Sequence, residues 1–163
     1  MWRNYIMKKL LVLLAVLLIF TGFTGCNKKE KEFTDGTIVL KLTEDFEEQE
    51  DEDYDYVLQS GDVLVLCSHA DKKFLEENSV SDITLDEFTR FFSEGETLLL
   101  DRKFNGYNVF SYEAAVNNTE YYYLIGVYET NDGYWLVNFV CDKGDTKKYE
   151  AKFLDWAGKV TFK

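Results

Sequence analysis

The stretch Tyr134-Trp135-Leu136-Val137-Asn138-Phe139-Val140-Cys141 decides the fold class that this chain can adopt. It is rich in aromatic and β-branched residues, which favour a β-strand. Successive side chains of a strand point to opposite faces, which gives two apolar sets: Trp135, Val137, Phe139 and Cys141 on one face, and Leu136 and Val140 on the other. Because both faces are apolar, we expect this strand to lie inside a sheet that is covered on both sides.

Three stretches of similar composition precede it, at residues 97–103, 107–116 and 121–129. The segments that separate these stretches carry turn signals: Asn105-Gly106, Asn117-Asn118 and Asn131-Asp132-Gly133. Strands joined by such short turns pair as successive hairpins. This part of the sheet is therefore predicted to be an antiparallel meander.

A further hairpin is predicted upstream, where residues 54–59 and 63–68 flank the turn Ser60-Gly61-Asp62. Its second arm again has two apolar faces: Val63, Val65 and Cys67 against Leu64 and Leu66. Residues 37–42, after Gly36, are predicted to form the first strand of the domain.

Three helices are predicted beside these strands. Residues 71–78 favour a short helix, and Thr84 with Glu87 forms a capping box that opens a second helix through Phe92. A third helix over residues 146–157, with Asp145 as its cap, has an apolar stripe made of Tyr149, Phe153, Trp156 and Ala157. These elements predict an α+β fold in which an antiparallel β-sheet of about six to seven strands is packed between helices, an α/β/α sandwich.

The N-terminal residues have the pattern of a targeting signal. Arg3, Lys8 and Lys9 precede an unbroken run of eleven apolar residues, from Leu10 to Phe20. That run has the length of a signal-peptide core and is too short to span a membrane as a helix. Met7 would serve as well as Met1 to begin such a segment.

The signal segment ends in Phe23-Thr24-Gly25-Cys26, which resembles the lipobox of bacterial lipoproteins, with phenylalanine where leucine is usual. The resemblance implies cleavage between Gly25 and Cys26 and a diacylglycerol on the Cys26 thiol. That lipid would hold the chain at the extracytoplasmic face of the cell membrane. The resulting division is 1–25 for the signal peptide, 26–35 for a charged tether and 36–163 for the folded domain.

The chain is acidic, with 30 acidic and 18 basic residues and a net charge of −12. A charge of this sign repels nucleic acids, so we expect no nucleic-acid partner. Nine of the twelve residues from Glu44 to Asp55 are carboxylates. Asp51, Asp53 and Asp55 have the alternate spacing that opens a calcium-binding EF-hand loop, but Tyr56 stands where that loop needs glycine. A solvated acidic loop is the favoured interpretation, and calcium binding is the alternative.

Little in the sequence points to catalysis. His69 is the single histidine, and it follows a predicted strand rather than a motif; there is no glycine-rich phosphate loop, CxxC or HExxH pattern. We therefore expect a non-enzymatic protein with no catalytic residue, no cofactor and no bound metal. The aromatic runs Tyr121-Tyr122-Tyr123 and Phe91-Phe92 could line a ligand groove, although packing between layers explains most of them.

Cys67 and Cys141 each end a predicted buried strand. A disulfide between them requires the two strands to end at the same edge of the sheet, because bridged Cα atoms lie within about 7 Å. Antiparallel neighbouring strands would forbid the bond. Two buried free thiols are the favoured interpretation, since free cysteine is among the most frequently buried residues.

The order of elements and several strings have a counterpart in a known family. These strings are Asn105 to Glu113, Glu120 to Tyr128, Tyr134 to Cys141, and a last helix with Tyr149, Phe153 and Trp156. Over residues 36–163 the chain resembles the PsbP-like family, whose fold is shared with a nuclear-import accessory protein that binds the Ran GTPase. The family's Pro-x-x-Trp after the first strand is replaced by Thr43-Glu44-Asp45-Phe46, where Phe46 takes the aromatic position.

The resemblance implies an antiparallel sheet between helical layers and a role without catalysis. Members of the family include a photosystem subunit, a GTPase partner, envelope lipoproteins and chaperones for exported toxins. We therefore expect a membrane-anchored binding or assembly module with a protein partner in the cell envelope. The alternative is a calcium- or small-ligand-binding cell-surface protein that uses the acidic residues 44–55.

Overall fold

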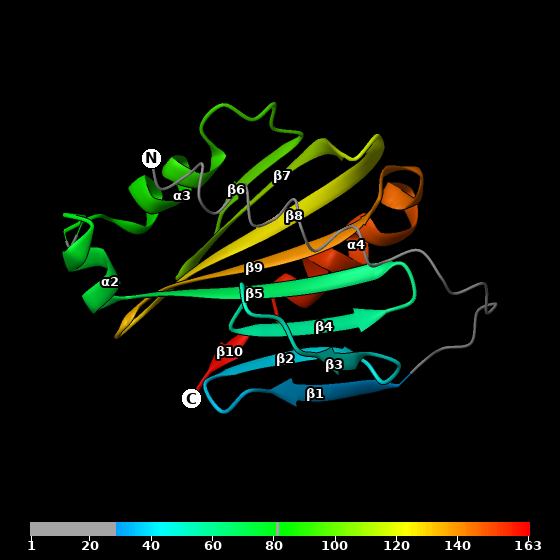
Figure 1. Ribbon diagram of the computed structural model, residues 1–163, viewed down its shortest axis with the longest axis horizontal. Helices are drawn as coiled ribbons and strands as arrows, with labels where there is room; N and C mark the ends of the chain where they lie inside the picture. Colours follow the sequence, from blue (N-terminus) through cyan, green and yellow to red (C-terminus); the bar gives the residue numbers. More distant parts are fainter. Residues whose placement is uncertain (1–28, 81) are drawn as a thin grey trace.

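A computed structural model describes residues 29–80 and 82–163 of the chain (Figure 1). The labels follow that figure, so helix numbering starts at α2. The elements in chain order are β1 (Glu30–Thr34), β2 (Ile38–Thr43), β3 (Glu47–Gln49), β4 (Tyr56–Ser60), β5 (Val63–Asp71), α2 (Lys72–Glu77), α3 (Leu85–Ser93), β6 (Leu100–Lys103), β7 (Tyr107–Val116), β8 (Thr119–Thr130), β9 (Gly133–Asp142), a 3₁₀ turn η2 (Lys143–Asp145), α4 (Thr146–Ala157) and β10 (Thr161–Phe162).

The main sheet has seven strands in the order β3-β4-β5-β9-β8-β7-β6, and every neighbouring pair is antiparallel. β9 lies at its centre, and all of its residues except Asp142 are buried. The predicted meander from β6 to β9 is confirmed, as is the β4–β5 hairpin. The joining of β5 to β9 is the one long-range connection in the sheet, and it brings the two strands with two apolar faces together.

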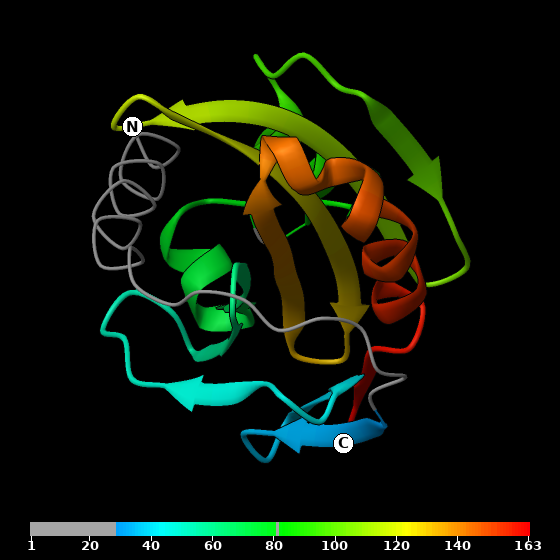
Figure 2. The same cartoon turned by 90° about the vertical axis from the view of Figure 1, so that its right-hand side faces the viewer.

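Helices cover both faces of this sheet, as predicted. α4 lies on one face of β8 and β9, and α2 and α3 lie on the other (Figure 2). The α4 side holds the larger apolar cluster, in which Phe153 and Trp156 of α4 pack against Tyr122 of β8 and Phe139 of β9. The α2 and α3 side holds a second cluster around Phe88.

A separate three-stranded sheet, β1-β2-β10, completes the layer on the α4 side. Here the structure differs from two predictions. The predicted first strand belongs to this small sheet and does not join the main one, and the last residues return to pair with it. The tether placed at residues 26–35 is too long, because Glu30–Thr34 pairs with β2 along its whole length and buries Phe33.

Phe46 fills the aromatic position that follows the first strands. Its ring is buried and meets Trp156 edge-on, with 5.5 Å between ring centroids, and meets Phe33 at 6.3 Å. Phe46 therefore lies between Phe33 of the small sheet and Trp156 of α4 and links the two through aromatic contacts.

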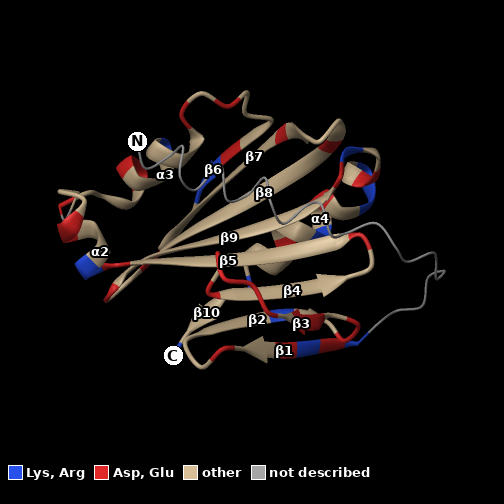
Figure 3. Ribbon diagram, in the orientation of Figure 1, with Lys and Arg blue, Asp and Glu red and all other residues tan. Residues whose placement is uncertain are grey.

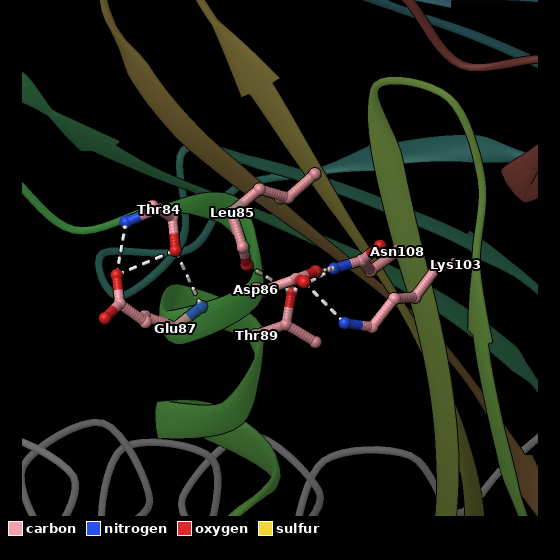
Figure 4. A network of polar contacts seen from close by, with 7 residues as sticks. All are labelled: Thr84, Leu85, Asp86, Glu87, Thr89, Lys103 and Asn108. Carbon is pink, nitrogen blue, oxygen red and sulfur yellow. Dashed lines mark hydrogen bonds and ion pairs between the residues drawn. The ribbon is translucent and has the colours of Figure 1, made fainter.

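A polar network fixes α3 at one end of the main sheet (Figure 4). Thr84 and Glu87 form the predicted capping box, in which the Glu87 carboxylate accepts from the Thr84 backbone N–H at 2.9 Å. Asp86 accepts hydrogen bonds from Lys103 of β6 and Asn108 of β7. Because these bonds join the first turn of α3 to the β6–β7 hairpin, the helix is held over that end of the sheet.

In the part of the chain that the structure describes, no α-helix combines the length and the apolar character needed to cross a membrane.

Candidate functional site

The face of the main sheet that carries α2 and α3 extends beyond both helices. Alternation along β5, β8 and β9 sends Leu64, Tyr123 and Val140 to the same side as the residues under α2 and α3. They belong to a third apolar cluster, which contains no residue from a described helix. We call this part of the sheet the tyrosine face. Its buried residues are Val57, Leu64, Leu66, Tyr123 and Val140, and the partly exposed Tyr54, Tyr112, Ala114 and Tyr121 pack against them.

The β7–β8 hairpin aligns the tyrosines of this face. Asn117 and Asn118 form a two-residue turn with φ values of 50° and 66°, the left-handed region that such hairpin turns require. This turn places Tyr112 directly opposite Tyr123, and their rings stack with centroids 5.1 Å apart. Tyr121 meets Tyr123 edge-on at 6.5 Å. The four tyrosines thus line one patch of the sheet.

The hydroxyl groups of this patch are neutral hydrogen-bonding groups. Burial raises the pKa of Tyr54, Tyr112 and Tyr123 well above the usual tyrosine value, and it raises the pKa of Tyr121 as well. The Tyr123 hydroxyl is buried and has no hydrogen-bond partner within the described structure.

An acidic pocket of about 430 Å³ opens beside the tyrosine face, at the β3–β4 edge of the sheet. Its lining residues are Glu48, Gln49, Glu50, Asp51, Tyr54, Asp55, Tyr56 and Val57. Tyr54 and Val57 also belong to the tyrosine face, so the two surfaces are continuous. Figure 3 shows the acidic residues running along the coil that joins β3 to β4.

Side chains of the acidic loop bond to the neighbouring strands and to the loop itself. The Asp55 carboxylate accepts the backbone N–H of His69 on β5 at 2.7 Å, and Tyr56 donates to Glu48 at 2.8 Å. Asp51 accepts the backbone N–H of Asp53 at 2.8 Å. These bonds give the pocket wall a defined shape although it lies in a loop.

The three calcium candidates do not converge on one point. Asp51 turns back on its own loop and Asp55 binds the β5 backbone. Among residues 29–80 and 82–163, no group of three or more Asp, Glu, His or Cys side chains is close enough to hold a metal ion. The acidic residues are therefore gathered as a charged wall and not as a coordination sphere.

His69 lies inside β5 and not after it as predicted, because that strand continues to Asp71. Its ring stacks on Trp135 with centroids 4.6 Å apart, and Nε2 lies 3.7 Å from an Asp132 carboxylate oxygen. Trp135 and its neighbours belong to the α4 side of the sheet, so His69 is on the opposite face from the tyrosine face.

Cys67 and Cys141 are separate, buried thiols. β5 and β9 are antiparallel neighbours, and Cys67 pairs with Val137, four residues away from Cys141 along β9. At about 3.3 Å per residue this separation is roughly 13 Å, which is too far for a disulfide. Burial raises the pKa of the Cys141 thiol to about 12, so it stays protonated.

The lipobox residues Phe23, Gly25 and Cys26 lie outside the described residues.

Of the predicted groove residues, Tyr121 and Tyr123 lie on the tyrosine face. Tyr122 is buried on the α4 side, and Phe91 and Phe92 belong to α3. The aromatic runs did not predict that Tyr112 and Tyr54 join Tyr121 and Tyr123. The turn Asn117-Asn118 carried the signal for Tyr112, because a two-residue hairpin loop fixes the register of both strands. No local sequence pattern predicts that Tyr54 joins this patch. It does so because β4 lies beside β5, and β5 lies beside β9.

Solved structures share this architecture. The solution structure of cyanobacterial PsbP from Synechocystis sp. PCC 6803 is similar with a TM-score of 0.56 and 14% sequence identity, over 90% of this chain and 99% of that chain. The fold of the described domain is therefore PsbP-like, which confirms the expectation from the sequence.

Two other solved structures are similar at lower scores. LpqN, described as involved in cell envelope biogenesis of Mycobacterium tuberculosis, has a TM-score of 0.46 and 9% identity, over 84% of this chain and 92% of its own. A protein from Bacteroides thetaiotaomicron has a TM-score of 0.43 and 12% identity, over 77% of this chain and 45% of its own. No protein-family model and no curated protein sequence matches the chain.

Proposed function

We propose that this chain is a lipid-anchored accessory protein of the cell envelope that binds a partner protein and catalyses no reaction. The observation that carries the binding role is the group of partly exposed tyrosines on the tyrosine face, Tyr54, Tyr112 and Tyr121. Tyrosine combines a large apolar ring with a hydrogen-bonding hydroxyl, and it is enriched at protein interfaces for that reason. A PsbP-like fold suits such a role, although the fold by itself names no partner.

The anchoring part of the proposal rests on the sequence. The lipobox resemblance gives Cys26 as the lipidated residue, and β1 begins only four residues later, at Glu30. The folded domain would therefore sit close to the membrane surface. Residues 1–25 hold three basic and no acidic residues, so the cleaved chain would carry 15 basic and 30 acidic residues and a net charge of −15. This charge would keep the domain from lying flat on anionic lipid headgroups.

Replacing Cys26 by serine is expected to abolish membrane anchoring, because the hydroxyl cannot replace the thiol in the thioether to diacylglycerol. Stable anchoring needs two acyl chains, so the variant should move to the aqueous phase in detergent partitioning or retain the mass of the precursor. Asn27→Ser is the matched control and should partition like the wild type. A Cys26→Ser protein that stays in the detergent phase with the wild-type mass would contradict the anchor.

The binding role is tested by photocrosslinking in intact cells. With p-benzoylphenylalanine in place of Tyr121, on the tyrosine face, we expect one dominant adduct to an envelope protein. The same group in place of Lys147, exposed on α4 on the opposite side of the sheet, should give none. Equal adducts from both positions, or none from position 121, would overturn the proposed function.

A further inference from the structure

We propose that Asn105 is a site of spontaneous deamidation, at which the backbone nitrogen of Gly106 attacks the side-chain amide and a carboxylate replaces it. The product is aspartate or isoaspartate. This inference does not depend on the binding role, because the reaction needs only the turn itself and water.

The first step of the reaction forms one carbon–nitrogen bond and breaks another. A solvent base removes the N–H proton of Gly106, and the nitrogen attacks Cγ of Asn105 and closes a succinimide ring. The bond between Cγ and Nδ2 breaks, and Nδ2 takes a proton from water and leaves as ammonia. Water then adds to either ring carbonyl and opens the ring to aspartate or isoaspartate. No group is oxidised or reduced, and water is the co-reactant.

The structure leaves both reacting groups accessible. Asn105 and Gly106 form the exposed turn between β6 and β7. The Phe104 N–H donates to the Tyr107 carbonyl at 2.9 Å and closes the hairpin around them. Within the described part of the chain, neither the Asn105 amide nor the Gly106 N–H makes a hydrogen bond. A Cβ built on Gly106 would meet nothing within 4 Å, so water and base can reach the turn.

Glycine at position 106 removes the main steric obstacle to ring closure. The Cβ of any other residue would lie beside the attacking nitrogen, and glycine has none. Asn105 is the single asparagine in the sequence that precedes a glycine. The turn also requires this glycine, because its φ is +86°. Three other asparagines lie exposed in turns but precede residues with side chains: Asn117, Asn118 and Asn131.

Hydrogen bonds hold the remaining described asparagines. Nδ2 of Asn78 and the N–H of the following Ser79 both donate to backbone carbonyls of α2, at 2.8 and 3.0 Å. Asn108 and Asn138 are buried, and their side-chain amides donate hydrogen bonds as well. Ring closure at these positions requires these bonds to break, so we expect it to be slow.

Deamidation would alter the hairpin that holds α3. It adds a negative charge at the turn, where the Glu129 N–H of β8 donates to the Gly106 carbonyl at 3.4 Å. Isoaspartate also adds a carbon atom to the backbone of the turn, and turn length sets the register of a hairpin. Among the described strands, β6 pairs with β7 alone, and its Lys103 binds Asp86 of α3. A distorted turn therefore weakens this end of the sheet.

The test follows every asparagine while the full chain, purified from cells and held in phosphatidylcholine nanodiscs, is incubated at mildly alkaline pH. Proteolysis and tandem mass spectrometry at successive times locate each change from amide to acid and separate isoaspartate from aspartate. We expect Asn105 to convert at least about tenfold faster than any other asparagine, because its attacking group is adjacent and unhindered. The rate should rise with the hydroxide concentration, and both products should form.

Two synthetic peptides, of residues 102–107 and 76–80, separate the effect of the fold from that of the local sequence. Asn105 should convert at about the same rate in the chain as in its peptide. Asn78 is the matched control, and it should convert at least about tenfold more slowly in the chain than in its peptide, because hydrogen bonds protect it only in the folded state.

Hydrogen exchange measures the effect on the hairpin. The Phe104 amide should exchange faster in the converted protein than in fresh protein, because its bond to Tyr107 closes the altered turn. In Asn105→Ser, which cannot deamidate at this position, that exchange should stay constant during the incubation.

An Asn105 that stays intact in the chain while its peptide converts would overturn the proposal. Aspartate without isoaspartate would overturn it as well, because direct hydrolysis of the amide would then replace the succinimide. Unchanged exchange at Phe104 after conversion would overturn the effect on the hairpin.

Discussion

Phe153→Ala is expected to lower the free energy of unfolding by about 3–5 kcal/mol, because it removes a fully buried ring from the centre of the α4 interface. Phe153 has no exposed surface, and its ring lies between aromatic rings of four neighbours, with centroid distances from 5.6 to 6.3 Å: Tyr122, Phe139, Tyr149 and Trp156. These four rings cannot move far enough to fill the cavity that the substitution leaves. The loss in the free energy of unfolding should therefore lie in the upper part of the range for large core residues.

Urea unfolding followed by tryptophan fluorescence measures this loss as a shift of the midpoint at unchanged slope. Phe104→Ala is the matched control, because the same atoms are removed from a ring that is 42% exposed. Its cost should stay within about 1 kcal/mol. If Phe153→Ala also costs less than about 1 kcal/mol, α4 does not carry the core, and its apolar stripe would have to serve another surface.

The stripe on α4 illustrates what the sequence could predict. Spacing at i, i+4 and i+7 is a local signal, and it identified Phe153 and Trp156 as core residues, which the structure confirms. Short turns with asparagine and glycine are local signals too, and they predicted each hairpin from β6 to β9. Both kinds of signal predict the structure correctly because each depends on interactions within about ten residues of chain.

β1 escaped prediction for the opposite reason. Its sequence Glu-Lys-Glu-Phe-Thr has four exposed residues and one buried one, Phe33, so its composition is that of a solvated tether. β1 is a strand because it pairs with β2. The sequence of β1 alone does not show that it has a pairing partner. The same holds for β3, three exposed residues inside the acidic run that pair with β4.

The cap of α4 shows a further limit. Asp145 stands at the N-cap position as predicted, but its side chain makes no capping hydrogen bond. Its carboxylate instead lies close to Asp62 at the β4–β5 turn, and Lys148 approaches both acids. The contact of Asp145 with Asp62 and Lys148 competes with the capping hydrogen bond to the α4 backbone. The N-cap position was therefore predicted correctly, but the capping hydrogen bond is not formed.

The candidate site also combines features that local sequence signals predict with features that depend on the tertiary structure. Tyr121 and Tyr123 stand out in the sequence, and the hairpin register adds Tyr112. The contact between the acidic pocket and the tyrosine face depends on β4 lying beside β5, and β5 beside β9. That order decides which face the acidic loop borders, and no single stretch of the chain encodes it.

Gly133→Ala is the second substitution expected to have a large effect, with a loss of about 3 kcal/mol or more. Gly133 begins β9 with a φ of +144°, a backbone conformation that disfavours any side chain. A Cβ built there would lie 2.1 Å from the Ala70 carbonyl oxygen and 3.0 Å from the Asp71 Cα. Both contacts are with the backbone of β5, so relief requires the β5–β9 ladder to open at this end.

Two other glycines separate the costs that Gly133→Ala combines. Gly36 has a φ of +108° and nothing within 4 Å of a built Cβ, so Gly36→Ala measures the backbone conformation alone. Gly144 has neither a positive φ nor a close neighbour, so Gly144→Ala should be neutral or slightly stabilising. The melting temperature of Gly133→Ala should therefore lie far below that of Gly36→Ala, and that of Gly36→Ala should lie below that of Gly144→Ala. Because the same loop is tied to α2 through the Lys72 N–H and the Asp132 carbonyl, hydrogen exchange should also speed up at Lys72 in Gly133→Ala. If Gly133→Ala and Gly36→Ala have the same melting temperature, the close approach of β9 to β5 does not hold in solution.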